Sequence, residues 1–161
     1  MNTTTLPSTN SAAEPRLNFP KAAPAVFAAM LAAQQTVNQS DIERPLMELV
    51  KIRASQINGC AFCLDMHFRD AKKAGETDER LYLLNAWQDA PHYYTERERA
   101  ALRWTEALTR LSSTHISEEL FDQVRAHFNE AELTQLTLAI VVINGWNRFN
   151  VGFNIPPRFA F

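Results

Sequence analysis

The sequence predicts an all-α fold, a single-domain helical bundle of about seven helices. Apolar residues recur every three to four positions through most of the chain, which is the period of a helix with one buried face. Capping residues and glycines separate these stretches. The chain has 161 residues, of which 46% are apolar and 21% charged. This length and composition are typical of one globular domain.

The first 20 residues are expected to form a flexible N-terminal segment, because Thr, Ser and Asn dominate it and few apolar side chains are available for burial. The helical domain is expected over residues 21–161. Its first two helices each carry an apolar face, with Phe27, Met30, Leu31 and Val37 on the first, and Leu46, Val50, Ala54 and Ile57 on the second.

Five further helices are expected at about residues 60–74, 77–87, 95–111, 117–128 and 130–150. Asn58-Gly59 breaks the chain before the first of them, since glycine suits a left-handed helix end. Thr77 can cap the second, and Thr95 with Glu98 matches a capping box for the third. The last helix is apolar on most sides, which predicts a central position. The apolar, proline-broken tail at residues 151–161 is expected to pack on the domain or a neighbouring subunit, or to cover the site.

The charge and the apolar pattern exclude several classes of partner. The formal net charge is −2, whereas nucleic acid or an anionic membrane would call for a basic surface. The longest apolar run, residues 136–143, is far shorter than the roughly 20 residues that span a bilayer. The N-terminus lacks the pattern of a signal peptide, and two cysteines are too few for a secreted disulfide framework. We therefore expect a cytoplasmic protein that binds neither nucleic acid nor membrane.

The candidate chemistry lies in the stretch Cys60-Ala-Phe-Cys63-Leu-Asp-Met-His67, which holds both cysteines. Two intervening residues bring the sulfurs within disulfide reach at the start of a helix. Cys63 and His67 are one helical turn apart and share a face. Because the thiolate is the reactive form of cysteine and a nearby imidazole promotes it, the spacing predicts redox-active thiols.

A fourth candidate is Glu48, which precedes the Asn58-Gly59 break by ten residues. If the helices on either side fold back as a hairpin, Glu48 comes level with residues near 68. Its carboxylate would then lie beside His67 and could orient and charge-balance the imidazole. His67 could in turn take the proton of Cys63.

The residues alone leave the nucleophile open. The positive end of the helix favours Cys60, while the imidazole of His67 favours Cys63. Two other interpretations of the pair also remain. One is a zinc site formed by Cys60, Cys63 and His67, which is awkward because three ligands would lie on one helix. The other is an inert buried pair.

Glu48 followed by Cys60-x-x-Cys63-x-x-x-His67, within ELVKIRASQINGCAFCLDMHFRDAKKAGE, resembles the active-site signature of alkylhydroperoxidase D-like proteins, which belong to the carboxymuconolactone decarboxylase superfamily. The resemblance extends over about residues 20–150. It implies an all-helical fold, assembly into trimers or hexamers, and thiol-dependent peroxidase activity. It assigns Cys63 the peroxidatic role, Cys60 the partner role, and His67 with Glu48 the proton relay.

The chain departs from this signature inside the cysteine pair. The best-studied members of the family have a second histidine there, whereas this chain has Ala61 and Phe62. Those members also take electrons from a lipoylated partner.

The sequence thus predicts a hydroperoxide-reducing enzyme that cycles between dithiol and disulfide and uses no metal and no cofactor besides the cysteine pair. Its partners would be a hydroperoxide substrate, an external thiol or lipoyl-type reductant, and further copies of itself. Two alternatives are a lactone-acid decarboxylase of the same superfamily, which needs no redox-active cysteines, and a redox-sensing interaction protein with little turnover.

Overall fold

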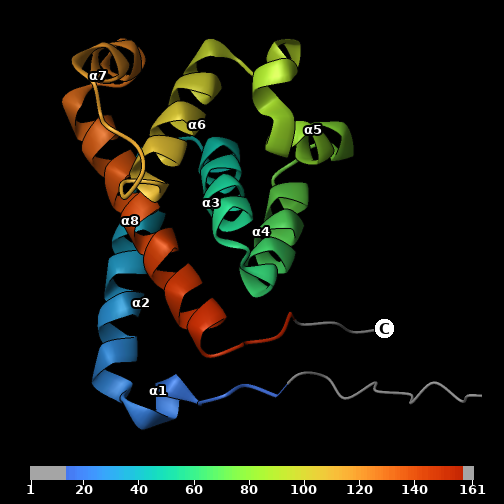
Figure 1. Ribbon diagram of the computed structural model, residues 1–161, viewed down its shortest axis with the longest axis vertical. Coiled ribbons are helices and arrows are strands. Elements are labelled where there is room, and N and C mark those ends of the chain that lie inside the picture. Colours follow the sequence, from blue (N-terminus) through green and yellow to red (C-terminus); the bar gives the residue numbers. More distant parts are fainter. Residues whose placement is uncertain (1–13, 158–161) are drawn as a thin grey trace, which may run out of the picture.

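A computed structural model describes residues 14–157, and within that range the secondary structure is helical with no strand, which confirms the all-α prediction. The described range holds eight α-helices and two 3-10 helices: α1 (Phe19–Ala22), α2 (Pro24–Asn38), α3 (Arg44–Asn58), α4 (Ala61–Lys73), α5 (Asp78–Leu83), η1 (Leu84–Asp89), η2 (Pro91–Tyr93), α6 (Glu96–Thr109), α7 (Glu118–Arg125) and α8 (Glu130–Gly152). Figure 1 labels the α-helices.

Helix α3 lies at the centre of the molecule, where it contacts α4, α6 and α8 (Figure 1). Every residue from Leu46 to Ser55 is buried, including the charged ones. Helix α8 crosses α3 and also packs on α2, α4 and α6. The central position expected for the last helix is therefore shared with α3. No helix among the described residues is long and apolar enough to cross a membrane.

Two apolar clusters hold the helices on α3. The larger one joins α3, α6 and α8, and the smaller one joins α3 to α4, α5, η1 and α6. Burying one large aliphatic side chain contributes about 1.5–3 kcal/mol. The two clusters therefore fix the positions of α3, α4 and α8, which supply most of the site. Their fully buried members include Val50, Ala101, Leu136 and Ile140 in the first and Leu49, Ile52, Leu84 and Leu102 in the second.

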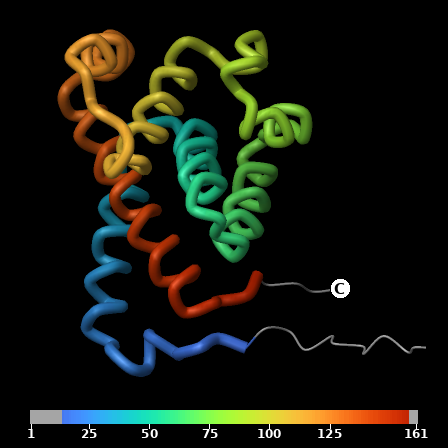
Figure 2. The backbone as a smooth tube through the Cα atoms, in the orientation of Figure 1, coloured from blue at the N-terminus to red at the C-terminus, as the bar shows by residue number. Residues whose placement is uncertain are grey.

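The turn between α3 and α4 brings the predicted residues together. Gly59 adopts the left-handed conformation expected of it, with φ 66°, and the chain reverses so that α3 and α4 form a hairpin (Figure 2). The side chain of Asn58 donates hydrogen bonds to the side-chain oxygens of Asn144 and Asn147 on α8, at 2.9 and 2.8 Å. The contacts of Asn58 with α8 thus hold in place the turn that precedes Cys60.

The helix expected at residues 77–87 is regular only in its first half. Thr77 caps α5 as predicted, accepting a bond from the Arg80 amide. The α-helix ends at Leu83, and the 3-10 helix η1 follows with a kink at Ala86. The kink serves tertiary contacts, because Trp87 is buried and donates its indole N–H to Glu106 on α6, at 2.8 Å. The expected helix at 117–128 likewise ends early, at Arg125.

The two ends of the described chain lie side by side (Figure 2). The Arg16 amide donates to the carbonyl of Phe153 at 2.8 Å, and its guanidinium donates to the carbonyl of Gly152 at 3.1 Å. Helix α1 begins at Phe19, two residues before the expected start of the domain at residue 21. The rest of the expected flexible segment, residues 1–13, and the last four residues of the tail lie outside the described residues.

Candidate active site

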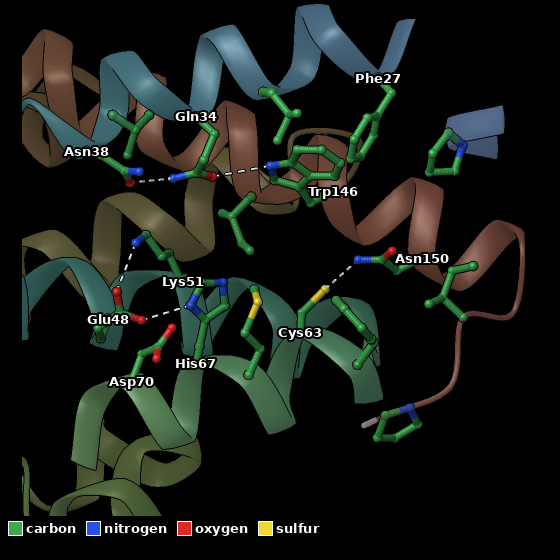
Figure 3. Close-up of a pocket in the computed structure, with 18 of the residues that line it drawn as sticks. Phe27, Gln34, Asn38, Glu48, Lys51, Cys63, His67, Asp70, Trp146 and Asn150 are labelled. Carbon is green, nitrogen blue, oxygen red and sulfur yellow. Dashed lines mark hydrogen bonds and ion pairs between the residues drawn. The ribbon is translucent and has the colours of Figure 1, made fainter. Parts of the chain in front are cut away.

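A cavity of about 1060 Å³ opens between α2, α3, α4 and α8, as Figure 3 shows. Residues from both ends of the described chain, including Phe19 and Pro156, complete its wall. Three of the four predicted site residues border this cavity, namely Glu48, Cys63 and His67. The fourth, Cys60, is not among the described residues that line it.

The two cysteines begin α4. Cys60 is the N-cap residue, and its sulfur accepts a hydrogen bond from the Cys63 amide at 3.3 Å. Their Cα atoms are 5.3 Å apart, and the two sulfurs are joined in a disulfide. Both side chains are almost fully buried, with 1% of Cys60 and none of Cys63 exposed. Since only Cys63 borders the cavity, its sulfur is the one placed to meet a small molecule bound there.

The sulfur of Cys63 also receives a hydrogen bond from α8. Asn150, near the end of that helix, donates its side-chain N–H to the Cys63 sulfur at 3.2 Å (Figure 3). Asn150 is itself buried, with 7% of it exposed. A hydrogen bond donated to a sulfur stabilises the thiolate more than the thiol. This contact therefore favours the nucleophilic form of Cys63 when the disulfide is reduced.

Glu48 and His67 meet as the hairpin argument predicted. Nδ1 of His67 lies 2.8 Å from Oε2 of Glu48, and both side chains are buried. Because an ionised carboxylate can only accept, Nδ1 is the protonated nitrogen of the neutral ring and Nε2 keeps its lone pair. Nε2 has no hydrogen-bond partner among the described residues and faces the cavity in Figure 3. The imidazole is thus oriented to act as a base within the cavity.

Lys51 completes the charge balance of this pair. Its ammonium lies 2.9 Å from Oε1 of Glu48, so each carboxylate oxygen has one partner. Burial raises the pKa of the Glu48 carboxyl. The hydrogen bond from His67 and the charge of Lys51 outweigh burial and hold the pKa below its ordinary value of 4.5. Glu48 is therefore ionised near neutral pH and stabilises a proton arriving on His67.

The donor atoms do not favour a metal at the cysteines. Among the described residues, Glu48, His67 and Asp70 have potential ligand atoms within 4.8 Å of one another, and this set includes neither cysteine. The ammonium of Lys51 in contact with Glu48 opposes a second cation at that place. The zinc site considered for Cys60, Cys63 and His67 therefore has no support in this geometry.

Phe62, which stands between the two cysteines, lines the cavity and packs against the cluster around the disulfide. The wall next to Cys63 is consequently apolar at this point. Any proton exchanged with Cys63 would have to pass through His67 or water rather than through a second imidazole.

Two residues at the site were not predicted from the sequence. Lys51 follows Glu48 by three residues on the same helix, and this spacing could have indicated an ion pair. Asn150 is the last of three asparagines, with Asn144 and Asn147, that recur every three residues in the otherwise apolar α8. Polar side chains repeated along a buried helix face need partners, and this repeat was the available signal.

Comparison with known proteins places the chain in a family. Residues 24–107 match the profile of the carboxymuconolactone decarboxylase family. The uncharacterized protein YdfG of Bacillus subtilis is 42% identical over 136 residues, which cover 84% of this chain and 92% of that protein.

Two solved structures share the fold. A protein of unknown function from Agrobacterium tumefaciens, ATU0492, described as a candidate AhpD antioxidant defence protein, is 39% identical with a TM-score of 0.88, over 91% of this chain and all of that one. The debrominase Bmp8 is 20% identical with a TM-score of 0.74, over 84% of this chain and 72% of that one, and shows the fold alone. The chain belongs to the carboxymuconolactone decarboxylase family and is an alkylhydroperoxidase D-like protein within it.

Proposed function

We propose that this protein is a thiol peroxidase that reduces hydroperoxides through a Cys60–Cys63 dithiol/disulfide cycle. The observation that carries the proposal is the environment of the Cys63 sulfur. This sulfur borders a cavity, accepts a hydrogen bond from Asn150 and is one helical turn from an imidazole oriented by Glu48. The likeness to a candidate AhpD antioxidant protein supports the same activity.

In the first step, Nε2 of His67 takes the thiol proton of Cys63, and the thiolate attacks the terminal oxygen of the hydroperoxide. The O–O bond breaks as an S–O bond forms. The leaving alkoxide takes the proton back from His67 and departs as an alcohol. Cys63 is oxidised to a sulfenic acid, and the hydroperoxide is reduced.

In the second step, the Cys60 thiol attacks the sulfenic sulfur and releases water, which closes the disulfide. The position of Cys60 at the N-cap, with its Cα 5.3 Å from that of Cys63, allows this without a change of helix α4. An external dithiol, of the thiol or lipoyl type, then exchanges with the disulfide. It leaves as its own disulfide and restores both cysteines to thiols.

The proposal includes a cytoplasmic location, where such reductants are maintained, and assembly into a trimer or hexamer. Several large apolar side chains are exposed on the single chain, among them Leu31, Val141 and Val151. Analytical ultracentrifugation tests the assembly, with a monomer as the contrary result.

The activity is tested by following hydroperoxide consumption in the presence of dihydrolipoamide. Cys63→Ser should abolish reductant-dependent consumption, because no other described cysteine borders the cavity. Without added reductant, Cys60→Ser should still reduce one equivalent of hydroperoxide per chain and then stop. Unchanged turnover in Cys63→Ser contradicts the proposal, and stoichiometric oxidation of the wild type without turnover would identify a redox sensor instead.

A further inference from the structure

The cavity is much larger than the reacting group of the proposed substrate. Its volume is about 1060 Å³, whereas pockets of about 300–1,000 Å³ hold molecules of drug size. A peroxide group needs only the part of this space next to Cys63. The remainder is available to the body of a substantially larger molecule.

Most of the wall beyond Cys63 is apolar. Phe62 on α4 and Ile143 on α8 lie near the disulfide cluster, and the wall continues along α2 and α8. Figure 3 shows Phe27 and Trp146 on the side opposite α4. Such a surface favours a hydrocarbon chain or ring over a polar body. The further apolar lining residues include Leu31, Met47 and Met66.

The charged groups of the cavity are paired except at one end. Glu48 holds both Lys51 and His67, and Asp70 lies 3.3 Å from the ammonium of Lys73. Arg44, at the start of α3, is exposed and lines the cavity. Among the described residues it has no ion pair and no side-chain hydrogen bond. The cavity therefore carries one cation that is not neutralised.

The position of Arg44 relative to Cys63 follows from the hairpin. The contact between Glu48 and His67 sets the register of α3 against α4. Arg44 is one turn before Glu48, and Cys63 is one turn before His67 on the helix that runs the opposite way. The two residues are therefore separated by eight residues of helix, or about 12 Å along the axes.

We propose that the substrate is an amphipathic organic hydroperoxide, with a long apolar body and a carboxylate that Arg44 binds while the O–O bond lies at Cys63. This inference rests on the proposed peroxidase function. Arginine suits a carboxylate because its planar guanidinium presents two parallel N–H donors. Hydroperoxides of unsaturated fatty acids have this chemistry, since their acid group and peroxide group are separated by a hydrocarbon chain.

The experiment compares two substrates that differ only at the carboxyl group, a charged linoleic acid hydroperoxide with the peroxide at carbon nine and its neutral methyl ester. Both substrates are used below the concentration at which they form micelles. We expect kcat/KM to be about fivefold higher for the acid than for the ester, because an exposed ion pair contributes up to about 1 kcal/mol. Arg44→Gln should reduce this ratio to about one, and Arg44→Lys should keep most of it. Arg125→Gln, on the exposed face of α7, is the matched loss of an arginine charge and should leave the ratio unchanged.

A binding measurement separates this inference from the proposed activity. Calorimetric titration of the disulfide form with linoleic acid and with its methyl ester requires no turnover. We expect tighter binding of the acid in the wild type and equal binding in Arg44→Gln. If the acid and ester bind and react equally in the wild type, the Arg44 assignment is overturned while the peroxidase stands. If no hydroperoxide is consumed but the acid binds through Arg44, the peroxidase fails and the anion site stands.

Discussion

At the scale of single residues, Asn150 is the polar side chain in direct contact with the Cys63 sulfur. Its side chain donates to the Cys63 sulfur at 3.2 Å in a place shielded from water. Hydrogen bonds to charged groups contribute about 1.5–3 kcal/mol, and about 1.4 kcal/mol corresponds to a factor of ten. The contact is therefore large enough to change the rate at which the Cys63 thiolate reacts by about a factor of ten or more.

We expect Asn150→Leu, which keeps the volume and removes the donor, to slow the reaction of the Cys63 thiolate by about tenfold or more. The rate of iodoacetamide alkylation across a range of pH in the Cys60→Ser background measures this directly. Asn38→Leu is the control, because Asn38 lies on α2 across the cavity and bonds to Gln34. If neither Asn150→Leu nor Asn38→Leu changes the alkylation of Cys63, Asn150 does not act on the sulfur.

The Glu48 carboxyl links stability to pH. Its pKa in the folded chain is below the ordinary value of 4.5 because His67 and Lys51 outweigh its burial. A lowered folded pKa means that the ionised group contributes stability above pH 4.5, and that this contribution is lost as the pH falls through the folded pKa. We expect the thermal midpoint of the wild type to fall more steeply below pH 4.5 than that of Glu48→Gln. Parallel curves would contradict this linkage.

The sequence predicted part of this site and missed part, for a physical reason. Glu48, His67 and Cys63 lie on two consecutive helices, so helical period and one turn were enough to bring them together. Asn150 reaches Cys63 only because α8, almost ninety residues later, crosses that hairpin. Its position depends on packing between distant helices, which spacing along the chain does not specify.

At the scale of elements, the turn at Gly59 sets the register between α3 and α4. The residue has φ 66°, and a Cβ placed there would meet nothing within 4 Å. Any loss of stability caused by a side chain at this position therefore comes from the backbone conformation and not from a steric clash. The sequence identified this turn because glycine is the residue that tolerates the left-handed region. It did not reveal that Asn58 is bonded to α8, since the partners are distant in sequence.

Gly59→Ala should lower the free energy of unfolding by about 1–2 kcal/mol, which is the penalty of the left-handed conformation for a residue with a side chain. Urea denaturation measures the change. Gly152→Ala is the matched control, because its Cβ also meets nothing within 4 Å and its φ is not positive. That variant should be neutral or slightly stabilising. Equal effects of the two substitutions would mean that the turn carries no conformational strain.

The segment η1, which follows α5, shows that an apolar pattern of helical period does not always produce a regular α-helix. The sequence has the period of a helix through Trp87, yet the chain kinks at Ala86. The kink allows the Trp87 indole to bond Glu106, and Asn85 to accept from Arg53. The tertiary contacts of Trp87 and Asn85 override the local propensity.

At the scale of the whole molecule, a buried ion pair joins the central helix to α6. Nε of Arg53 on α3 lies 2.7 Å from Oε1 of Glu106, which also accepts from Trp87. This pair connects α3, η1 and α6 at one point. Arg110 lies 3.3 Å from the other oxygen of Glu106, so removing Arg53 takes away the closer of two cations beside this partly buried carboxylate.

Arg53→Ala should therefore lower the free energy of unfolding by about 1.5–3 kcal/mol, the usual contribution of a hydrogen bond to a charged group. The double variant Arg53→Met with Glu106→Gln should recover most of this loss, because it removes both charges and keeps an acceptor for Trp87. Urea denaturation of the three variants checks the expectation. A double variant no more stable than Arg53→Ala would show that the loss does not come from the Glu106 carboxylate that has lost Arg53.

The all-α fold could be predicted because the helical spacing of apolar residues and the capping residues are local properties of the sequence. They do not depend on how the helices pack. The sequence could not show that α2, α3, α4 and α8 enclose a cavity of about 1060 Å³. Leu31 and Trp146 have the pattern of core residues, yet both line this cavity. Whether an apolar side chain faces another helix or a cavity depends on the distances between helices.

The most direct test of the account is the fate of the two sulfurs after one equivalent of hydroperoxide is added to the fully reduced protein. We predict one equivalent of alcohol, and peptide mass spectra in which Cys60 and Cys63 are linked with the loss of two hydrogen atoms. In Cys60→Ser, dimedone should label Cys63 as its sulfenic acid. Reduced cysteines that stay free while the hydroperoxide persists, or a dimedone adduct on Cys60 in Cys63→Ser at the same rate, would contradict the assignment of Cys63 as the peroxidatic residue.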